Sequence, residues 1–91
     1  MTPPRSYTVT LTTRALRMLR KLPATIRPAI ARAIGDLPSN PRPAGVGRGP
    51  DGTYKIRVGD YRILYDIEDD QLSVLVVKMG HRSEVYRGQI R

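Results

Sequence analysis

The feature that most constrains the fold is a pair of alternating segments joined by a tight turn, "YKIRVGDYRILY", at residues 54–65. Apolar and polar side chains alternate on both sides of Gly59-Asp60, as they do in β-strands with one buried face. A two-residue loop with glycine first is compatible with a type II′ turn. Such a turn sets Arg57 directly opposite Arg62. The sequence therefore predicts a β-hairpin with a defined register.

This register gives the hairpin two different faces. One face collects the apolar and aromatic side chains of Tyr54, Ile56, Val58, Tyr61, Ile63 and Tyr65. The other face collects Lys55, Arg57, Arg62 and Leu64. Like charges that face each other across a sheet destabilise it by up to ~1 kcal/mol, and a bound phosphate would reverse the effect by accepting bidentate donors. The basic face therefore suggests an anion-binding surface, with an ordinary solvated surface as the alternative interpretation.

The N-terminal half reads as one strand and two helices. Residues 6–11 alternate in strand fashion, and Thr12 or Thr13 can cap a helix that ends before Pro23. Its apolar stripe is formed by Ala15, Leu16, Leu19 and Leu22. Its other face is basic and carries Arg14, Arg17, Arg20 and Lys21. A second amphipathic helix is expected from about Thr25 to Leu37, with Pro28 in its first turn.

The C-terminal half reads as a loop followed by three strands. Residues 38–52 are rich in proline and glycine and predict a loop that is either functional or mobile. Strands are expected at 53–58, 61–68 and 71–79, and the last, "QLSVLVVKM", is apolar on both faces, as in a central strand. The order β-α-α-β-β-β predicts an α+β domain in which two N-terminal helices pack on a largely antiparallel four-stranded sheet.

Length and charge narrow the class of function. A chain of 91 residues suits a single domain over 1–91. It contains no cysteine, no long apolar run and no apolar signal-peptide core, which fits a cytoplasmic protein without a membrane anchor. The net charge of +8 favours nucleic acid or an acidic protein as the partner. No cluster of carboxylates or histidines suits a metal ion, and we expect no cofactor.

The segment "GHRSEVYR" adds further polar chemistry beyond the last strand. His81 is the only histidine, and imidazole is the side chain that changes charge near neutral pH. Arg82 and Tyr86 follow it. A single histidine is more often structural than catalytic, and a tyrosine can equally be a core aromatic.

Together, "KIRVGDYRILY" and "GHRSEVYR" resemble the C-terminal half of the RelE family of bacterial type II toxins. The element order agrees, so the resemblance extends over nearly the whole chain. It implies a ribosome-dependent mRNA endonuclease that needs no metal and cuts the codon in the ribosomal A site by attack of a ribose 2′-hydroxyl. It also implies a cognate antitoxin, with which the chain would form a hetero-oligomer.

The resemblance assigns the reaction to residues of the hairpin and of the C-terminal segment. By match these are Lys55, Arg57, Arg62, Arg82 and Tyr86, and His81 is a further candidate for proton transfer. Arg57 stands where the best-studied type of member has a second lysine, and arginine is a poor base because it holds its proton. We expect Arg57 and Arg62 to stabilise charge and Tyr86 to orient or stack on a base. The order of acid and base among Lys55, His81 and Tyr86 stays open.

Alternative functions fit parts of the same pattern. The basic face of the first helix is either a docking surface for ribosomal RNA phosphates or an ordinary solvated helix face. A toxin of the same fold that inhibits DNA gyrase, as the related ParE family does, is the second hypothesis. A non-catalytic nucleic-acid-binding module is the third, and requires only the net charge.

Overall fold

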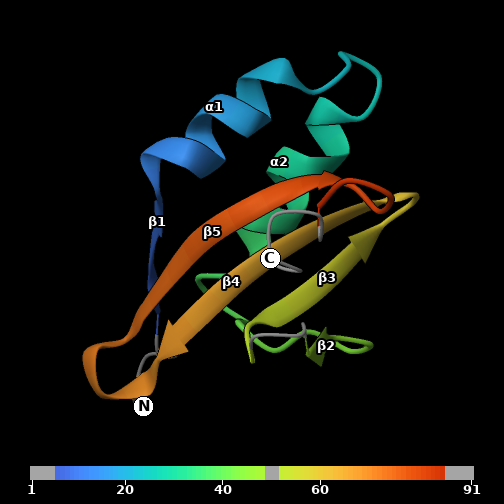
Figure 1. Ribbon diagram of the computed structural model, residues 1–91. Helices are drawn as coiled ribbons and strands as arrows, with labels where there is room; N and C mark the ends of the chain where they lie inside the picture. Colours follow the sequence, from blue (N-terminus) through green and yellow to red (C-terminus); the bar gives the residue numbers. More distant parts are fainter. Residues whose placement is uncertain (1–5, 49–51, 86–91) are drawn as a thin grey trace.

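The computed structural model describes residues 6–48 and 52–85 (Figure 1). The elements are β1 (Thr8–Leu11), α1 (Thr13–Lys21), α2 (Arg27–Asp36), β2 (Gly47–Arg48), β3 (Tyr54–Val58), β4 (Tyr61–Glu68), a 3₁₀ turn (Asp69–Gln71) and β5 (Ser73–His81). Two helices lie on one side of a single sheet, which confirms the predicted α+β class.

The sheet has the order β1-β5-β4-β3-β2. β1 runs parallel to β5, and every other neighbouring pair is antiparallel. β5 thus lies between two strands, which explains why its sequence is apolar on both faces. The predicted count of four strands misses β2, a two-residue strand that pairs Gly47 with Lys55 and Arg48 with Tyr54. Its glycine-rich sequence carries no strand signal, and only its pairing with the edge of β3 defines it.

The hairpin between β3 and β4 has the predicted register, from Val58 opposite Tyr61 to Tyr54 opposite Tyr65. Gly59 has a φ of 59° at the first turn position, as a type II′ turn requires. An L-residue with a side chain rarely adopts this conformation, so glycine fixes the turn and the turn fixes the register. Arg57 accordingly lies opposite Arg62.

A β-bulge interrupts the pairing of β4 with β5. Tyr65 pairs with Val76, whereas its neighbour Leu64 pairs with Lys78, so Val77 is an extra residue on β5. An extra residue moves every later side chain of the strand to the opposite face. Met79 therefore joins the buried core on the helix side, and Lys78 lies on the opposite side with Leu64. The alternation of the sequence alone does not predict this change of side.

The helices begin and end close to the predicted positions. The hydroxyl of Thr12 accepts a hydrogen bond of 3.0 Å from the backbone N–H of Ala15 and caps α1, as expected for one of the two threonines. Pro23 follows the C-cap residue Leu22. α2 begins at Arg27, two residues later than predicted, with Pro28 in its first turn.

The apolar stripe of α1 differs from the prediction at one position. Ala15 and Leu22 are buried, and Leu19 packs against the core, but the side chain of Leu16 is 38% exposed. Met18 takes its place and packs against the core. The short helix presents a narrow stripe to the sheet, and Leu16 lies outside it.

The core fills the space between the helices and the sheet. Its buried members are Ala15, Leu22, Ile30, Leu37, Ile63, Tyr65, Val74, Val76 and Met79. The apolar face of the hairpin packs against them, as predicted from its alternation. The helices therefore cover one face of the sheet, and the basic side chains of the hairpin lie on the other face.

The loop between α2 and β3 is fastened to the sheet at several points. Arg42 forms a bidentate pair with Asp69, with distances of 3.1 and 2.8 Å, and donates from Nε to the hydroxyl of Tyr54 at 3.2 Å. The buried hydroxyl of Tyr65 donates to the carbonyl of Pro41 at 2.6 Å. Arg48 lies over the Tyr54 ring, 4.4 Å from its centroid. These contacts fix the described part of the loop along the edge of β3.

Candidate functional site

Among the described residues, four cations lie on the face of the sheet opposite the helices, and we call this surface the basic face. They are Lys55, Arg57, Arg62 and Lys78. Cross-strand partners point to the same side of a sheet. The pairing therefore forms one row of Lys55, Leu64 and Lys78, beside a row in which Arg57 and Arg62 face each other. The three hairpin cations expected on one surface are brought together there.

The two opposed arginines of the basic face have different environments. Arg57 is exposed. Arg62 is only 9% exposed, and its Nη1 donates to the carbonyls of Gly59 at 3.1 Å and Tyr61 at 2.9 Å. These carbonyls lie in and beside the hairpin turn, so the charge of Arg62 is stabilised by the protein's own backbone. The cross-strand repulsion is thereby reduced, and Arg62 both belongs to the basic face and braces the turn.

Lys55 is half-buried beside the short edge strand β2. Its cross-strand partner is Gly47, and a Cβ added at Gly47 would lie 3.4 Å from Cε of Lys55. The aliphatic stem of the lysine therefore passes over the space that glycine leaves. A side chain at position 47 would crowd the lysine at this point.

His81 lies on the other side of the sheet. It pairs with Tyr61, whose ring packs against the core, and the two rings meet edge to face at 5.4 Å. The sheet thus separates the imidazole from the basic face. The structure therefore does not bring His81 onto the same face as Lys55, Arg57 and Arg62, with which it was grouped as a candidate.

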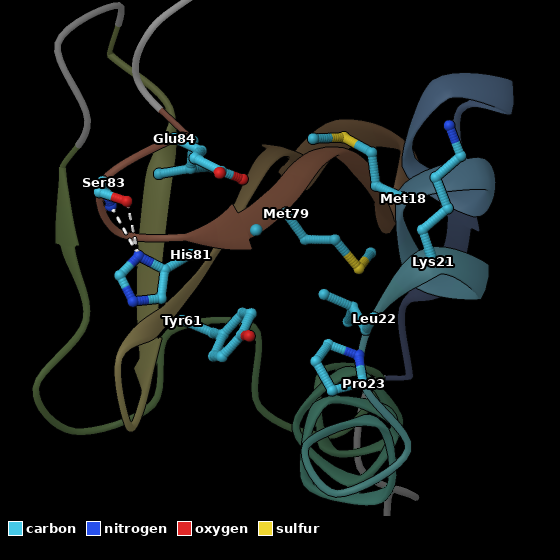
Figure 2. A pocket seen from close by; sticks show the side chains of 11 residues that line it. Met18, Lys21, Leu22, Pro23, Tyr61, Met79, His81, Ser83 and Glu84 are labelled. Carbon is cyan, nitrogen blue, oxygen red and sulfur yellow. Dashed lines mark hydrogen bonds between the residues drawn. The ribbon is translucent and has the colours of Figure 1, made fainter.

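Ser83 fixes the orientation and tautomer of His81. The backbone N–H of Ser83 donates to Nδ1 at 3.1 Å, and its Oγ lies 2.8 Å from the same nitrogen (Figure 2). Because the backbone N–H is only a donor, Nδ1 is the acceptor, and the neutral ring carries its proton on Nε2. The neutral imidazole thus offers a donor, and not a free base, at Nε2.

A cavity of about 550 Å³ lies beside His81, between the end of α1 and the end of β5 (Figure 2). Its walls combine apolar side chains with a few polar groups at the rim. The lining includes Met18, Lys21, Leu22, Tyr61, Met79 and His81. It opens on the helix side of the sheet and is distinct from the basic face.

Arg82 lies beside the tip of the hairpin. Its backbone N–H donates to the carbonyl of Asp60 at 2.8 Å, and its Nε is 3.8 Å from the carboxylate of the same residue. Both side chains are largely exposed, so this ion pair contributes little stability. The backbone hydrogen bond nevertheless ties the segment after β5 to the turn of the hairpin. Tyr86, the remaining candidate, lies outside the described residues.

The basic side chains of α1 face the solvent, as the sequence pattern predicts. Arg14, Arg17, Arg20 and Lys21 are all exposed, while Ala15 on the opposite side of the helix is buried. In Figure 1, α1 lies over β5 on the helix side of the sheet, away from the edge strand β2. Its cations therefore form a second positive surface, separate from the basic face.

Sequence reasoning missed Lys78 on the basic face. This residue is 5% exposed and lies directly across from Leu64, which is fully buried. The one signal in the sequence is the consecutive apolar pair before the lysine in "VVKM", which breaks the alternation. A pair of valines is also ordinary in a buried strand, so this signal does not by itself reveal a bulge.

The proteins that this chain resembles in sequence include toxins of bacteria. The family model described as ParE toxin of type II toxin-antitoxin system, parDE, matches residues 9–86. Toxin RelG of Mycobacterium tuberculosis is 42% identical over 84 residues, which cover 89% of this chain and 97% of that protein. The mRNA interferase toxin RelE of Escherichia coli is 32% identical over 91 residues, which cover 94% of this chain and 96% of that protein.

Solved structures agree with these sequence matches. The toxin–antitoxin complex RelBE2 of Mycobacterium tuberculosis contains a chain that superposes with a TM-score of 0.72 at 38% identity, covering 88% of this chain and 95% of that one. The isolated RelE toxin of Escherichia coli gives a TM-score of 0.72 at 31% identity, covering 93% and 96%. These matches in sequence and fold thus define a toxin of a type II toxin–antitoxin system. The chain belongs to the RelE family, within the RelE/ParE superfamily.

Proposed function

We propose that this protein is an mRNA endonuclease that acts on translated messages in the ribosome. The observation that carries the proposal is the basic face, on which Lys55, Arg57 and Arg62 gather on the side of the sheet that the helices leave uncovered. A relative of 32% identity over nearly its whole length is an mRNA interferase toxin. A surface of lysine and arginine suits the phosphates of an RNA strand.

The chemistry fits a metal-independent cleavage. The ribose 2′-oxygen forms a bond to the adjacent phosphorus, and the bond from phosphorus to the 5′-oxygen breaks. A base takes the proton of the 2′-hydroxyl, and an acid supplies one to the departing 5′-oxygen. The products are a 2′,3′-cyclic phosphate and a 5′-hydroxyl. The additional negative charge of the phosphorane is what the cations of the basic face would stabilise.

The environments of the two arginines suggest how they share this task. Arg57 is exposed and able to contact the phosphate directly. Arg62 is braced by the carbonyls of the turn and supplies a positive charge at a fixed position. Lys55 is the candidate for proton transfer on this face, and Tyr86 is a second candidate through the family resemblance alone. His81, whose neutral ring presents Nε2–H on the other side of the sheet, suits a supporting position better than that of the base.

Two kinds of partner follow from the proposal. The exposed cations of α1 would contact ribosomal RNA phosphates in a sequence-independent way. A cognate antitoxin would be the second partner, since relatives have been solved as toxin–antitoxin complexes in Mycobacterium tuberculosis and Escherichia coli. An acidic antitoxin segment would complement the net charge of +8 and fold as it binds. In this account the chain acts as one domain over residues 1–91.

The proposed substrate places the activity in the cytoplasm, where messages are translated. No helix in residues 6–48 and 52–85 is long and apolar enough to cross a membrane.

A ParE-like action on DNA gyrase is the second candidate, because the matching family model describes ParE toxins. The two functions make different predictions in the cell. Induction of an mRNA endonuclease produces new mRNA 5′ ends at codon positions in translated messages and arrests translation. Induction of a gyrase inhibitor produces DNA damage and leaves messages intact. Mapping mRNA 5′ ends after induction, with Arg57→Ala as the control, tests the proposal, and a map without codon-positioned ends would contradict it.

A further inference from the structure

Lys78 lies on the basic face although the alternation of the sequence does not place it there. We infer that Lys78 is a fourth charge-stabilising group of the basic face, placed there by the β-bulge at Val77. This inference rests on the proposed RNA-cleaving function. It adds a residue of β5 to a site that otherwise draws its cations from the hairpin and the C-terminal segment.

The register places Lys78 beside the other cations. Lys78 lies opposite Leu64, and Leu64 lies opposite Lys55, so the two lysines flank the same residue of the central strand β4. Adjacent strands are ~4.8 Å apart, which sets the two lysine backbones about 10 Å from each other. Arg62 is the diagonal neighbour of Lys78 at roughly 7–8 Å, a distance that long side chains bridge.

The bulge is the structural device that produces this arrangement. In an uninterrupted strand Lys78 would lie on the same side as Val76 and point into the core. A charged ammonium in that position would be strongly destabilising. The extra residue instead sends Met79 into the core and Lys78 to the basic face. Bulges that redirect a side chain are common beside active sites.

Burial makes the charge of Lys78 effective. The residue is 5% exposed, whereas Arg57 on the same face is exposed. Water screens a charge in this position weakly, so its field at a nearby phosphate is stronger than that of a surface lysine. Lys55 and Lys78 each also interact with another group of the protein. Such an interaction is compatible with the proposed role, because that role requires only that Lys78 is positively charged.

A set of variants separates the charge of Lys78 from its packing. Lys78→Met keeps the size of the side chain and removes the charge, while Lys78→Arg keeps the charge and changes the shape. Arg32→Met removes one charge from the exposed surface of α2 and serves as the control for net charge. Single-turnover cleavage of mRNA on programmed ribosomes is measured for each, together with the half-saturating ribosome concentration and the thermal unfolding midpoint.

The expected results for a charge-stabilising role are specific. Lys78→Met lowers the cleavage rate at least about tenfold, a smaller loss than for a donor in direct contact, and changes the half-saturating concentration by less than about threefold. Lys78→Arg and Arg32→Met stay within about threefold of the wild-type rate. A packing role predicts the opposite order, with Lys78→Met active and Lys78→Arg impaired.

The outcomes also separate this inference from the proposed function. Wild-type protein that does not cleave mRNA would refute the function itself. Wild-type protein that cleaves while folded Lys78→Met cleaves at an equal rate would refute the role of Lys78 alone. If Lys78→Met does not fold, Lys78→Gln takes its place, because it retains a hydrogen-bonding head without the charge. A wild-type rate in either folded neutral variant overturns the inference.

Discussion

Arg57 and Arg62 lie directly opposite each other across the hairpin, but only Arg62 is buried and bonded to the backbone. The sequence of the turn predicts that the two arginines face each other. The structure shows in addition that Arg57 is exposed and Arg62 is buried. Arg62 donates to two carbonyls at the turn, so it contributes to the stability of the hairpin as well as to the charge of the basic face.

This difference predicts different effects for alanine at the two positions. Arg57→Ala should lower the rate of mRNA cleavage by about 10²–10³, the range found when a single charge-stabilising donor is removed. Its free energy of unfolding should stay within about 0.5 kcal/mol of wild type, because the side chain is exposed. Urea denaturation and single-turnover cleavage measure the two quantities.

Arg62→Ala should lower both quantities. Two hydrogen bonds from a charged donor are lost, and the expected destabilisation is about 2 kcal/mol or more. A variant that keeps wild-type stability would show that the contacts at the turn are energetically unimportant. A variant that keeps wild-type cleavage would remove Arg62 from the site.

The contacts of Ser83 predict the tautomer of His81. The neutral ring should carry its proton on Nε2, because Nδ1 accepts the backbone N–H of Ser83. Nitrogen-15 NMR of the imidazole at a pH where it is neutral distinguishes the two tautomers directly. A proton found on Nδ1 would be incompatible with this geometry.

The position of His81 also predicts a limited effect on the reaction. His81→Ala should lower the cleavage rate by less than about tenfold, well below the loss expected for Arg57→Ala, because the ring lies on the helix side of the sheet. A loss as large as that of Arg57→Ala would return His81 to the reacting groups.

Tyr65 predicts a loss of stability at alkaline pH. Burial raises the pKa of this tyrosine from its ordinary value of 10.0 to about 12. The protonated phenol is thus favoured in the folded state. Its contribution is fully present below pH 10 and is lost as the pH rises through 12, for a total of about 3 kcal/mol.

The variant Tyr65→Phe tests this assignment. It should be less stable at neutral pH by about 1 kcal/mol, because the hydrogen bond to the carbonyl of Pro41 is lost. Its stability should fall less steeply between pH 10 and 12 than that of the wild type. Urea denaturation across this range provides both values, and parallel curves for the two proteins would refute the assignment.

The ion pair of Arg42 and Asp69 predicts a local effect on the loop after α2. Asp69→Asn should raise the rate of amide hydrogen exchange at Val46 and Gly47. The global free energy of unfolding should change by less than about 1 kcal/mol, since both charged groups are about half exposed. Asp70→Asn is the matched control, because it makes the same substitution at the neighbouring residue, which is not the partner of Arg42 in this ion pair. Equal exchange rates in the two variants would show that the pair does not hold the loop.

The sequence predicts much of this fold because local rules determine it. Glycine at the first turn position sets the hairpin register, and the alternation then assigns each side chain of β3 and β4 to a face. The threonine cap and the two prolines likewise place the helices to within two residues. These features depend on neighbours in the chain and not on distant contacts.

The remaining features depend on contacts between distant segments. β2 is a strand only because it pairs with β3, and Arg62 is buried only in the assembled hairpin. The bulge at Val77 is defined by the pairing register of β5 with β4, and it determines the face of the sheet on which Lys78 lies. The same pairing places His81 opposite Tyr61 and away from the basic face.

The most direct measurement is cleavage by the purified protein of an mRNA held in ribosomes with a defined codon in the A site. The account predicts a cut within that codon, giving a 2′,3′-cyclic phosphate and a 5′-hydroxyl, in the presence of a chelator as well as in its absence. The same message without ribosomes should stay intact, and Arg57→Ala should cut at least about a hundredfold more slowly. Intact mRNA in the ribosome-bound reaction, together with inhibition of DNA gyrase by the same preparation, would contradict the account.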